Sequence, residues 1–170
     1  MEADSPKDTT DLAEMAREVL TICAERDLCL ATAESCTGGL LASLLTDVEG
    51  VSSCFEAGIV AYSNEAKTIL LGVAPSLLQQ YGAVSREVAR AMVQGIFPRT
   101  SADLAVAVTG FAGPAGPDDE EGLVYLAVAN GRGYFDAWEC HFGKIGRDGV
   151  RHRAARAALA MLKIALSGIE

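Results

Sequence analysis

The chain has 170 residues, of which 50% are hydrophobic, and carries a net charge of −9 with a pI near 4.7. This length predicts a single domain, and the composition is that of a folded chain rather than a disordered one. The acidic balance disfavours a nucleic-acid partner, because a phosphate backbone requires a basic surface. No apolar run approaches the roughly 18 residues that a membrane span needs.

The beginning of the chain is polar and acidic and lacks the basic start and apolar stretch of a secretory signal. We expect residues 1–10 to be a flexible tail and residues 11–168 to form one domain. The five cysteines are scattered and include no CxxC pair, which is typical of reduced thiols in a cytoplasmic protein. The sequence therefore predicts a cytoplasmic protein with neither a membrane nor a direct nucleic-acid partner.

Helical and strand-like patterns alternate along the first two thirds of the chain. Asp11 and Glu14 resemble a capping pair that opens a first helix, whose apolar residues recur at helical spacing. Further helices are predicted at 39–46, 63–72, 74–81, 85–97 and 147–166. Strands are predicted at 28–33, 55–62, 104–108, 123–129 and 134–142, the last two forming a hairpin.

This order of elements predicts an α/β fold with a mixed, partly parallel sheet. The segment 104–108 is continuously apolar, as expected of a strand that is covered on both faces. In such sheets ligands bind beyond the carboxyl ends of the strands. The residues that follow each predicted strand are therefore the candidates for a functional site.

Three strand ends carry hydroxyl, amine and glycine residues. They are Thr32-Ala33-Glu34-Ser35-Cys36-Thr37-Gly38-Gly39, Tyr62-Ser63-Asn64-Glu65-Ala66-Lys67 and Thr109-Gly110-Phe111-Ala112-Gly113-Pro114. If the strands are parallel, the three turns converge on one crevice. That crevice would hold a serine, a tyrosine, a lysine, a threonine and several exposed backbone amides.

Ser35 and Lys67 suit nucleophilic catalysis. A serine hydroxyl is a poor nucleophile until a neighbour removes its proton, and serine–lysine pairs are a known variant of the hydrolase triad. Lys67 lies in an otherwise apolar stretch, so partial burial would lower its pKa toward the range of a general base. Tyr62 would relay the proton or orient the lysine.

Each of these residues also has a plainer interpretation. Ser35 or Thr37 can cap a helix, and the glycines at 38–39 can allow a tight turn. Tyr62 can be an aromatic residue at a strand end with a solvated hydroxyl, and Lys67 a solvated lysine in a first helical turn. The residues alone leave both interpretations open.

Other chemistries have less support. The only two histidines, His141 and His152, neighbour none of the motifs, which disfavours a serine–histidine triad and a histidine-rich metal site. Gly110–Pro114 is not a dinucleotide fingerprint, and the sequence has no Gly-Lys-Ser/Thr phosphate loop. The acidic run 118–121 could bind a hard cation, although such runs are more often solvated. We expect no metal and no cofactor.

Arg147 and Arg151 are four residues apart and share one face of the last predicted helix. The guanidinium fork of arginine suits a phosphate group. In an acidic protein this pair could therefore attract an anionic substrate. The alternative is that both arginines pair with nearby acids on the helix surface.

Five segments of the chain occur together in a recognisable order. They are Ala33-Glu34-Ser35-Cys36-Thr37-Gly38-Gly39, Tyr62-Ser63-Asn64-Glu65-Ala66-Lys67, Leu71-Gly72-Val73, Tyr81-Gly82-Ala83-Val84-Ser85 and Thr109-Gly110-Phe111-Ala112-Gly113-Pro114. With them the chain closely resembles the CinA carboxy-terminal domain family, the competence/damage-inducible proteins, from about Leu12 to Ile164.

The resemblance implies a nicotinamide-nucleotide amidase that hydrolyses the carboxamide of nicotinamide mononucleotide to nicotinic acid mononucleotide and ammonia, a step of NAD recycling. It also implies a three-layer α/β/α sandwich, a metal-free serine–lysine mechanism and a homodimer. Ser35 would be the nucleophile, Lys67 and Tyr62 its activating partners, and Thr109 a further hydroxyl of the active site. The expected substrate-binding residues are Cys36, Thr37, Gly38, Gly39, Gly110, Gly113, Arg147 and Arg151.

Two other functions remain open at this point. The same helix N-termini could bind a nucleotide without turnover, in a regulatory module. The family name also suggests an accessory role in competence or DNA damage, although the acidic charge disfavours direct DNA contact.

Overall fold

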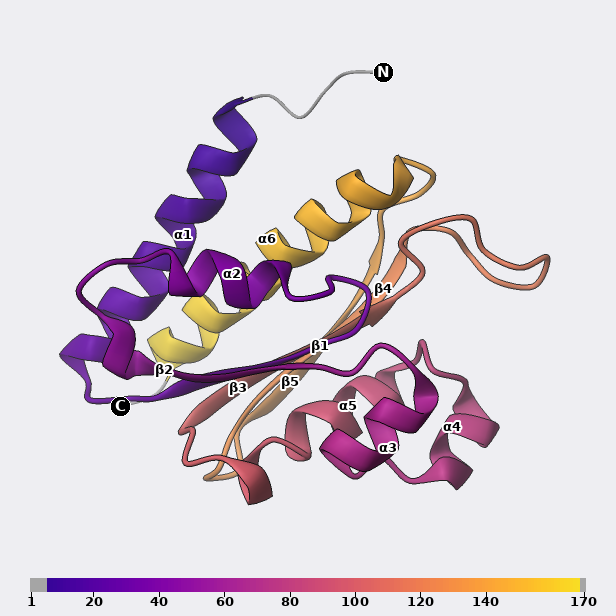
Figure 1. Ribbon diagram of the computed structural model, residues 1–170, viewed down its shortest axis with the longest axis horizontal. Coiled ribbons are helices and arrows are strands. Elements are labelled where there is room, and N and C mark those ends of the chain that lie inside the picture. The colour runs from indigo at the N-terminus through magenta and orange to yellow at the C-terminus, as the bar shows by residue number, and fades with distance from the viewer. Residues whose placement is uncertain (1–5, 169–170) are drawn as a thin grey trace.

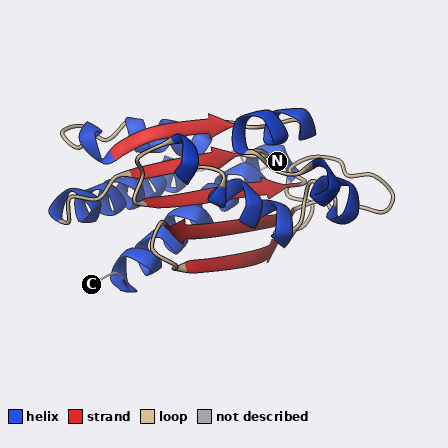
Figure 2. Cartoon of the chain, turned by 90° about the horizontal axis from the view of Figure 1, so that it is seen from below, coloured by secondary structure: helices blue, strands red, loops and turns tan. Residues whose placement is uncertain are grey.

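Five strands form one mixed sheet in the computed structural model, which describes residues 6–168. The strands are β1 (Leu30–Glu34), β2 (Phe55–Val60), β3 (Leu104–Gly110), β4 (Leu123–Asn130) and β5 (Phe135–His141). They lie side by side in the order β2-β1-β3-β4-β5 (Figure 2). β1 pairs in parallel with β2 and β3, whereas β4 runs antiparallel to β3 and β5.

Helices cover both faces of this sheet. They are α1 (Pro6–Glu25), α2 (Leu40–Thr46), α3 (Asn64–Leu71), α4 (Pro75–Tyr81), α5 (Arg86–Gln94) and α6 (Gly146–Gly168). Figure 1 shows α1, α2 and α6 on one face and α3, α4 and α5 on the other. The structure thus confirms the α/β/α sandwich with a partly parallel sheet.

The two faces of the sheet differ in side-chain size. Side chains alternate between the faces along each strand. In β3, Leu104, Val106 and Val108 belong to the core under α1, α2 and α6, whereas Ala105 and Ala107 belong to the core under α3, α4 and α5. The alanine face brings the helices that follow β2 close to the strands, and one of these helices carries Lys67.

The connections after β1 and β2 leave the sheet on opposite faces. The chain passes from β1 to α2 on one face, and from β2 to α3 on the other. The strands β1, β2 and β3 are parallel, so their carboxyl ends meet at one edge of the sheet. Such a divergence of connections opens a crevice at that edge, and the three predicted strand ends all lie there.

The N-terminal prediction is wrong in one respect. Helix α1 begins at Pro6, not at Asp11, so the part of the predicted tail at 6–10 is helical, and residues 1–5 lie outside the described residues. The helix starts early because proline is favoured in a first helical turn, where its missing N–H is not needed. Within residues 6–168, no helix is long and apolar enough to cross a bilayer.

Helix α5 also ends earlier than predicted, at Gln94 rather than at Phe97. Gly95 follows it at a close approach to α3, because a Cβ atom at this position would lie 1.9 Å from the carbonyl oxygen of Leu71. Replacing Gly95 with alanine is therefore expected to destabilise the fold by about 1–3 kcal/mol, as for an overpacked core. Urea unfolding would measure the loss. Gly131→Ala, where the nearest neighbour of a Cβ atom is 3.9 Å away, is the control, and equal stability of the two variants would contradict the prediction.

Candidate active site

Buried polar side chains gather at one edge of the sheet. The polar residues that are buried among those described are Thr32, Glu34, Ser35, Thr37, Lys67, Ser85 and Thr109. Apart from Thr32, all lie at the carboxyl end of β1 or β3, or in the first turn or cap of α3 or α5. With Thr32 as the exception, the buried side chains elsewhere in residues 11–168 are apolar. Polar side chains are costly to bury, so this edge of the sheet is where a functional site is expected.

Ser35 and Lys67 are in direct contact at this edge. The Nζ of Lys67 donates one hydrogen bond to Ser35 Oγ at 3.0 Å and another to the carbonyl oxygen of Tyr62 at 3.1 Å. Ser35 follows β1, and Lys67 stands in the first turn of α3, whose N-cap Ser63 accepts a hydrogen bond from the amide of Ala66. The residues that follow β1 and β2 therefore meet at one edge of the sheet, as predicted.

Lys67 is an unusual lysine because only 1% of its surface is exposed. Neither of its hydrogen-bond partners is a carboxylate. Burial lowers the pKa of the Lys67 amine below its usual value, and the nearby Cys36 opposes this only in part. A buried amine without a counter-ion favours the neutral form, which is the form that can accept a proton from a serine.

A cavity of about 260 Å³ opens in front of this pair. It is lined by Ser35, Cys36, Tyr62, Lys67, Ala83, Val84, Thr109, Gly110, Phe111, Ala112, Gly113, Pro114 and Arg147. All four predicted catalytic residues are in this lining, together with four of the predicted substrate-binding residues: Cys36, Gly110, Gly113 and Arg147.

Cys36 is the second potential nucleophile in the cavity. Burial raises the pKa of its thiol to about 12, so the thiol stays protonated near neutral pH. Since the thiolate is the reactive form of cysteine, Ser35 is the better candidate.

The hydroxyl proton of Thr109 is already used in a hydrogen bond within the protein. Its Oγ1 donates to the carbonyl oxygen of Ala83 at 2.8 Å, which ties the end of β3 to the segment before α5. A hydroxyl has one proton and two lone pairs. Toward a ligand in the cavity, Thr109 can therefore act as an acceptor.

Tyr62 contacts Lys67 through its main chain, not through its ring. Its side chain is 62% exposed, and its hydroxyl accepts a long hydrogen bond, 3.5 Å, from Nη1 of Arg147. The orienting role that was predicted for Tyr62 thus belongs to its carbonyl oxygen. A proton relay through the hydroxyl stays a prediction.

Arg147 reaches the mouth of the cavity from the first turn of α6. Its guanidinium lies over Gly113, where an added Cβ atom would come within 2.6 Å of Nη2. Glycine at this position therefore makes room for the arginine.

The remaining predicted residues, Thr37, Gly38, Gly39 and Arg151, are not in the lining of the cavity. Arg151 donates two hydrogen bonds to the carbonyl oxygen of Thr37, from Nε at 3.1 Å and from Nη2 at 2.9 Å. The Oγ1 atom of Thr37 is buried and has no hydrogen-bond partner among residues 6–168. Gly38 and Gly39 have positive φ angles of 60° and 93° and form the turn into α2.

Glu34 is a further member of this site that was not predicted from the sequence. Its carboxylate is fully buried and accepts hydrogen bonds from the first amides of α2. The signal was available, because an acid that ends a buried strand needs partners in the turn that follows.

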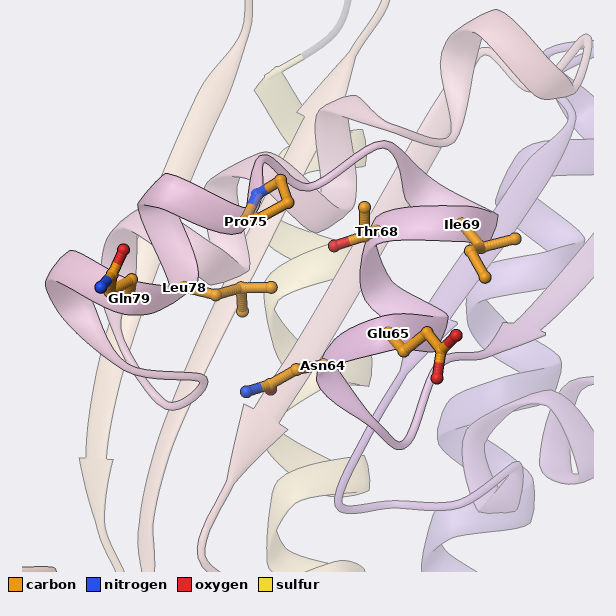
Figure 3. Close-up of a pocket in the computed structure, with 7 residues that line it drawn as sticks. All are labelled: Asn64, Glu65, Thr68, Ile69, Pro75, Leu78 and Gln79. Carbon is orange, nitrogen blue, oxygen red and sulfur yellow. The ribbon is translucent and has the colours of Figure 1, made fainter.

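A second, larger hollow of about 470 Å³ lies between α3 and α4 (Figure 3). It is lined by Asn64, Glu65, Thr68, Ile69, Pro75, Leu78 and Gln79. None of these residues was predicted to be catalytic or to bind the substrate, and the hollow is lined by no serine, cysteine or lysine that could act as a nucleophile. The smaller cavity at the sheet edge is therefore the candidate active site.

Comparisons with known sequences identify similar proteins along most of the chain. Residues 12–166 match the family described as the CinA C-terminal domain. The putative competence-damage inducible protein of Symbiobacterium thermophilum is 47% identical over 169 residues, 94% of this chain and 39% of that protein. The CinA-like protein of Syntrophomonas wolfei is 48% identical over 137 residues, 79% of this chain and 32% of that protein. The chain thus spans less than half the length of these curated relatives.

Solved structures share the fold. The competence/damage inducible protein CihA from Agrobacterium tumefaciens superposes with a TM-score of 0.89 at 42% identity, over 98% of this chain and 99% of that one. The competence damage-inducible protein A (ComA) from Klebsiella pneumoniae gives a TM-score of 0.88 at 34% identity, over 94% and 99% of the two chains.

Proposed function

The chain belongs to the CinA C-terminal domain family, and we propose that it is a serine–lysine amidohydrolase acting on nicotinamide mononucleotide. The observation that carries this proposal is the 3.0 Å contact between Ser35 Oγ and the buried amine of Lys67. The choice of substrate rests on the resemblance of the five sequence segments to the family, and the cavity is lined by groups that suit this substrate.

In the first step, neutral Lys67 takes the proton of Ser35 as Oγ attacks the carboxamide carbon. The resulting tetrahedral intermediate collapses when the Lys67 ammonium returns a proton to the leaving nitrogen, and ammonia departs. Water, activated by the same amine, then hydrolyses the acyl-serine to nicotinic acid mononucleotide. The carbonyl oxygen of Tyr62 holds Nζ in place throughout.

Thr109 would help to orient the carboxamide. Oγ1 of Thr109 can accept a hydrogen bond from the amide nitrogen of the substrate, because its own proton is donated to Ala83. The amide of Ser35 cannot stabilise the developing oxyanion, because it donates to the carbonyl oxygen of Val108 at 2.9 Å. That stabilisation must come from other donors at the cavity wall.

The direct test is to incubate the purified protein with nicotinamide mononucleotide. We expect ammonia and nicotinic acid mononucleotide to appear in equal amounts. Binding of the nucleotide without release of ammonia would overturn the amidase and favour the non-catalytic nucleotide-binding or regulatory module instead.

Arg147 is the arginine that we propose to bind the substrate phosphate. Arg147→Gln is expected to raise KM for nicotinamide mononucleotide about 10- to 100-fold, the value of a charged hydrogen bond. KM for the riboside, which lacks the phosphate, should barely change. Lys144→Gln, which removes an exposed cation three positions earlier, is the control. Equal effects of Arg147→Gln on both substrates would show that the phosphate is bound elsewhere.

The homodimer and the cytoplasmic location that were predicted from the sequence stay predictions. Sedimentation velocity at several protein concentrations would test the first of them.

A further inference from the structure

The turn that carries Ser35 is held from two sides by charged side chains that do not line the cavity. We infer that Glu34 and Arg151 are positioning residues, which fix Ser35 Oγ at hydrogen-bond distance from Lys67. This inference rests on the proposed function and deepens it. Glu34 acts from β1 on one side of the turn, and Arg151 acts from α6 on the other.

Glu34 ends β1 between Val60 of β2 and Val108 of β3 and has no exposed surface. Its carboxylate accepts hydrogen bonds from the amides of Gly39 at 3.0 Å and Leu41 at 3.1 Å through Oε2, and of Ala42 at 2.8 Å through Oε1. These hydrogen bonds satisfy both oxygens of the buried carboxyl group.

The first amides of a helix have no partner within the helix and are normally satisfied by the side chain of the N-cap residue. In α2 the N-cap is Gly39, which has no side chain and makes no such bond. Glu34 supplies the missing acceptor from outside the helix. In doing so it joins the end of β1 directly to the first turn of α2, with Ser35 in the loop between them.

That loop needs external support. Gly38 and Gly39 both adopt left-handed backbone conformations, and consecutive glycines lose more conformational freedom on ordering than any other pair. Within the turn, the amide of Gly38 donates to the carbonyl oxygen of Ser35 at 3.1 Å. The amide of Ser35 is itself held by β3, through the carbonyl oxygen of Val108 at 2.9 Å. The part of the turn that depends on neighbouring elements is therefore the glycine segment that follows Ser35 and sets the direction in which the chain leaves it.

Arg151 provides the second support. Its guanidinium places two donors, Nε and Nη2, on one acceptor, the carbonyl oxygen of Thr37. The same oxygen accepts the amide of Leu40 at 3.2 Å. A forked donor restricts both the position and the direction of a carbonyl group, so α6 fixes the peptide two residues beyond Ser35. Helices α2 and α6 lie on the same face of the sheet in Figure 1.

The two supports affect chemistry rather than binding. Neither Glu34 nor Arg151 lines the cavity, so neither is placed to touch a substrate. A displacement of about 1 Å between reacting groups can cost about 10²-fold in rate. Loss of either support should therefore lower kcat and leave KM nearly unchanged.

The experiment uses Glu34→Gln and Arg151→Gln. Glutamine at 34 keeps the shape of the side chain but places an NH2 group next to backbone N–H donors. Glutamine at 151 removes the two guanidinium donors that bind the carbonyl oxygen of Thr37. Both variants are expected to lose about 10- to 100-fold in kcat for nicotinamide mononucleotide, with KM within about threefold of the wild type. The exposed residues Glu49 and Arg153 provide matched controls, Glu49→Gln and Arg153→Gln, which should change neither constant.

A second readout does not depend on the substrate. The rate at which a fluorophosphonate reagent labels Ser35, followed by intact mass, reports the reactivity of Oγ and should fall in parallel with kcat. A wild type that is labelled but does not act on nicotinamide mononucleotide would refute the proposed substrate and still allow the positioning role to be measured. If Glu34→Gln does not fold, Arg151→Gln decides, because Arg151 is partly exposed on a long helix. A folded Arg151→Gln with unchanged labelling, or with a raised KM and unchanged kcat, would overturn the inference.

Discussion

Replacing Ser35 with alanine is expected to lower kcat for nicotinamide mononucleotide at least about 10³-fold, the cost of removing a serine nucleophile. The reason is geometric. Ser35 Oγ is the side-chain oxygen within hydrogen-bond distance of Lys67 Nζ, and the neighbouring Cys36 keeps its proton because burial raises the pKa of its thiol to about 12. The variant therefore has no group to replace the lost nucleophile.

The fold should tolerate this change. Ser35 is small, and Lys67 keeps its bond to the carbonyl oxygen of Tyr62, so we expect the free energy of unfolding to change by no more than about 1 kcal/mol. Ser43→Ala makes the same substitution at an exposed position of α2 and should retain full activity. Comparable activity of Ser35→Ala and the wild type would exclude Ser35 as the nucleophile.

Much of this architecture could be predicted from the sequence, for identifiable reasons. The continuous apolar run at 104–108 predicted a strand that is covered on both faces, and this strand is β3. The helices that were predicted to begin at 63 and 85 are α3 and α5, whose N-caps are Ser63 and Ser85. Parallel strands place their carboxyl ends at one edge. That single rule sufficed to bring Ser35, Lys67 and Thr109 together around one cavity.

The features of the site that could not be predicted depend on where side chains point and on contacts between residues that are far apart in the sequence. Arg147 and Arg151 share a helix face, and nothing in their spacing shows that one reaches the cavity mouth while the other binds the carbonyl oxygen of Thr37. Tyr62 was predicted to act through its side chain, but its main-chain carbonyl oxygen is the atom that accepts a hydrogen bond from Lys67. The acid at the end of the buried strand indicates that Glu34 needs partners, but it does not show that these partners are the first backbone amides of α2.

Replacing Lys67 is expected to change both activity and stability, because the burial that makes its amine a base also destabilises the folded protein. Burial lowers the pKa of the Lys67 amine in the folded protein below the value of 10.5 that is expected when the chain is unfolded. Between the two values the unfolded state binds more protons, so stability rises with pH across that window and becomes independent of Lys67 above it. At neutral pH, folding must therefore release a proton or bury a charge.

Lys67→Met is accordingly expected to lower kcat at least about 10³-fold and, at the same time, to raise the melting temperature at pH 7. Methionine fills the space of the lysine stem without a group that titrates. The gain in stability should shrink as the pH approaches 10.5, and thermal melts of both proteins at several pH values would measure it. Lys144→Met, at an exposed position, should show neither effect.

Lys67→Arg separates the role of the proton from the role of the charge. Arginine keeps a cation near Ser35 but does not give up its proton at accessible pH, so most activity should be lost, as with methionine. In the wild type, kcat/KM should rise with pH through an apparent pKa below 10.5, because the neutral amine is the active form. An active Lys67→Arg enzyme would show that Lys67 acts only electrostatically. A Lys67→Met protein less stable than the wild type at pH 7 would show that the bonds of the amine to Ser35 and Tyr62 outweigh the cost of burying it.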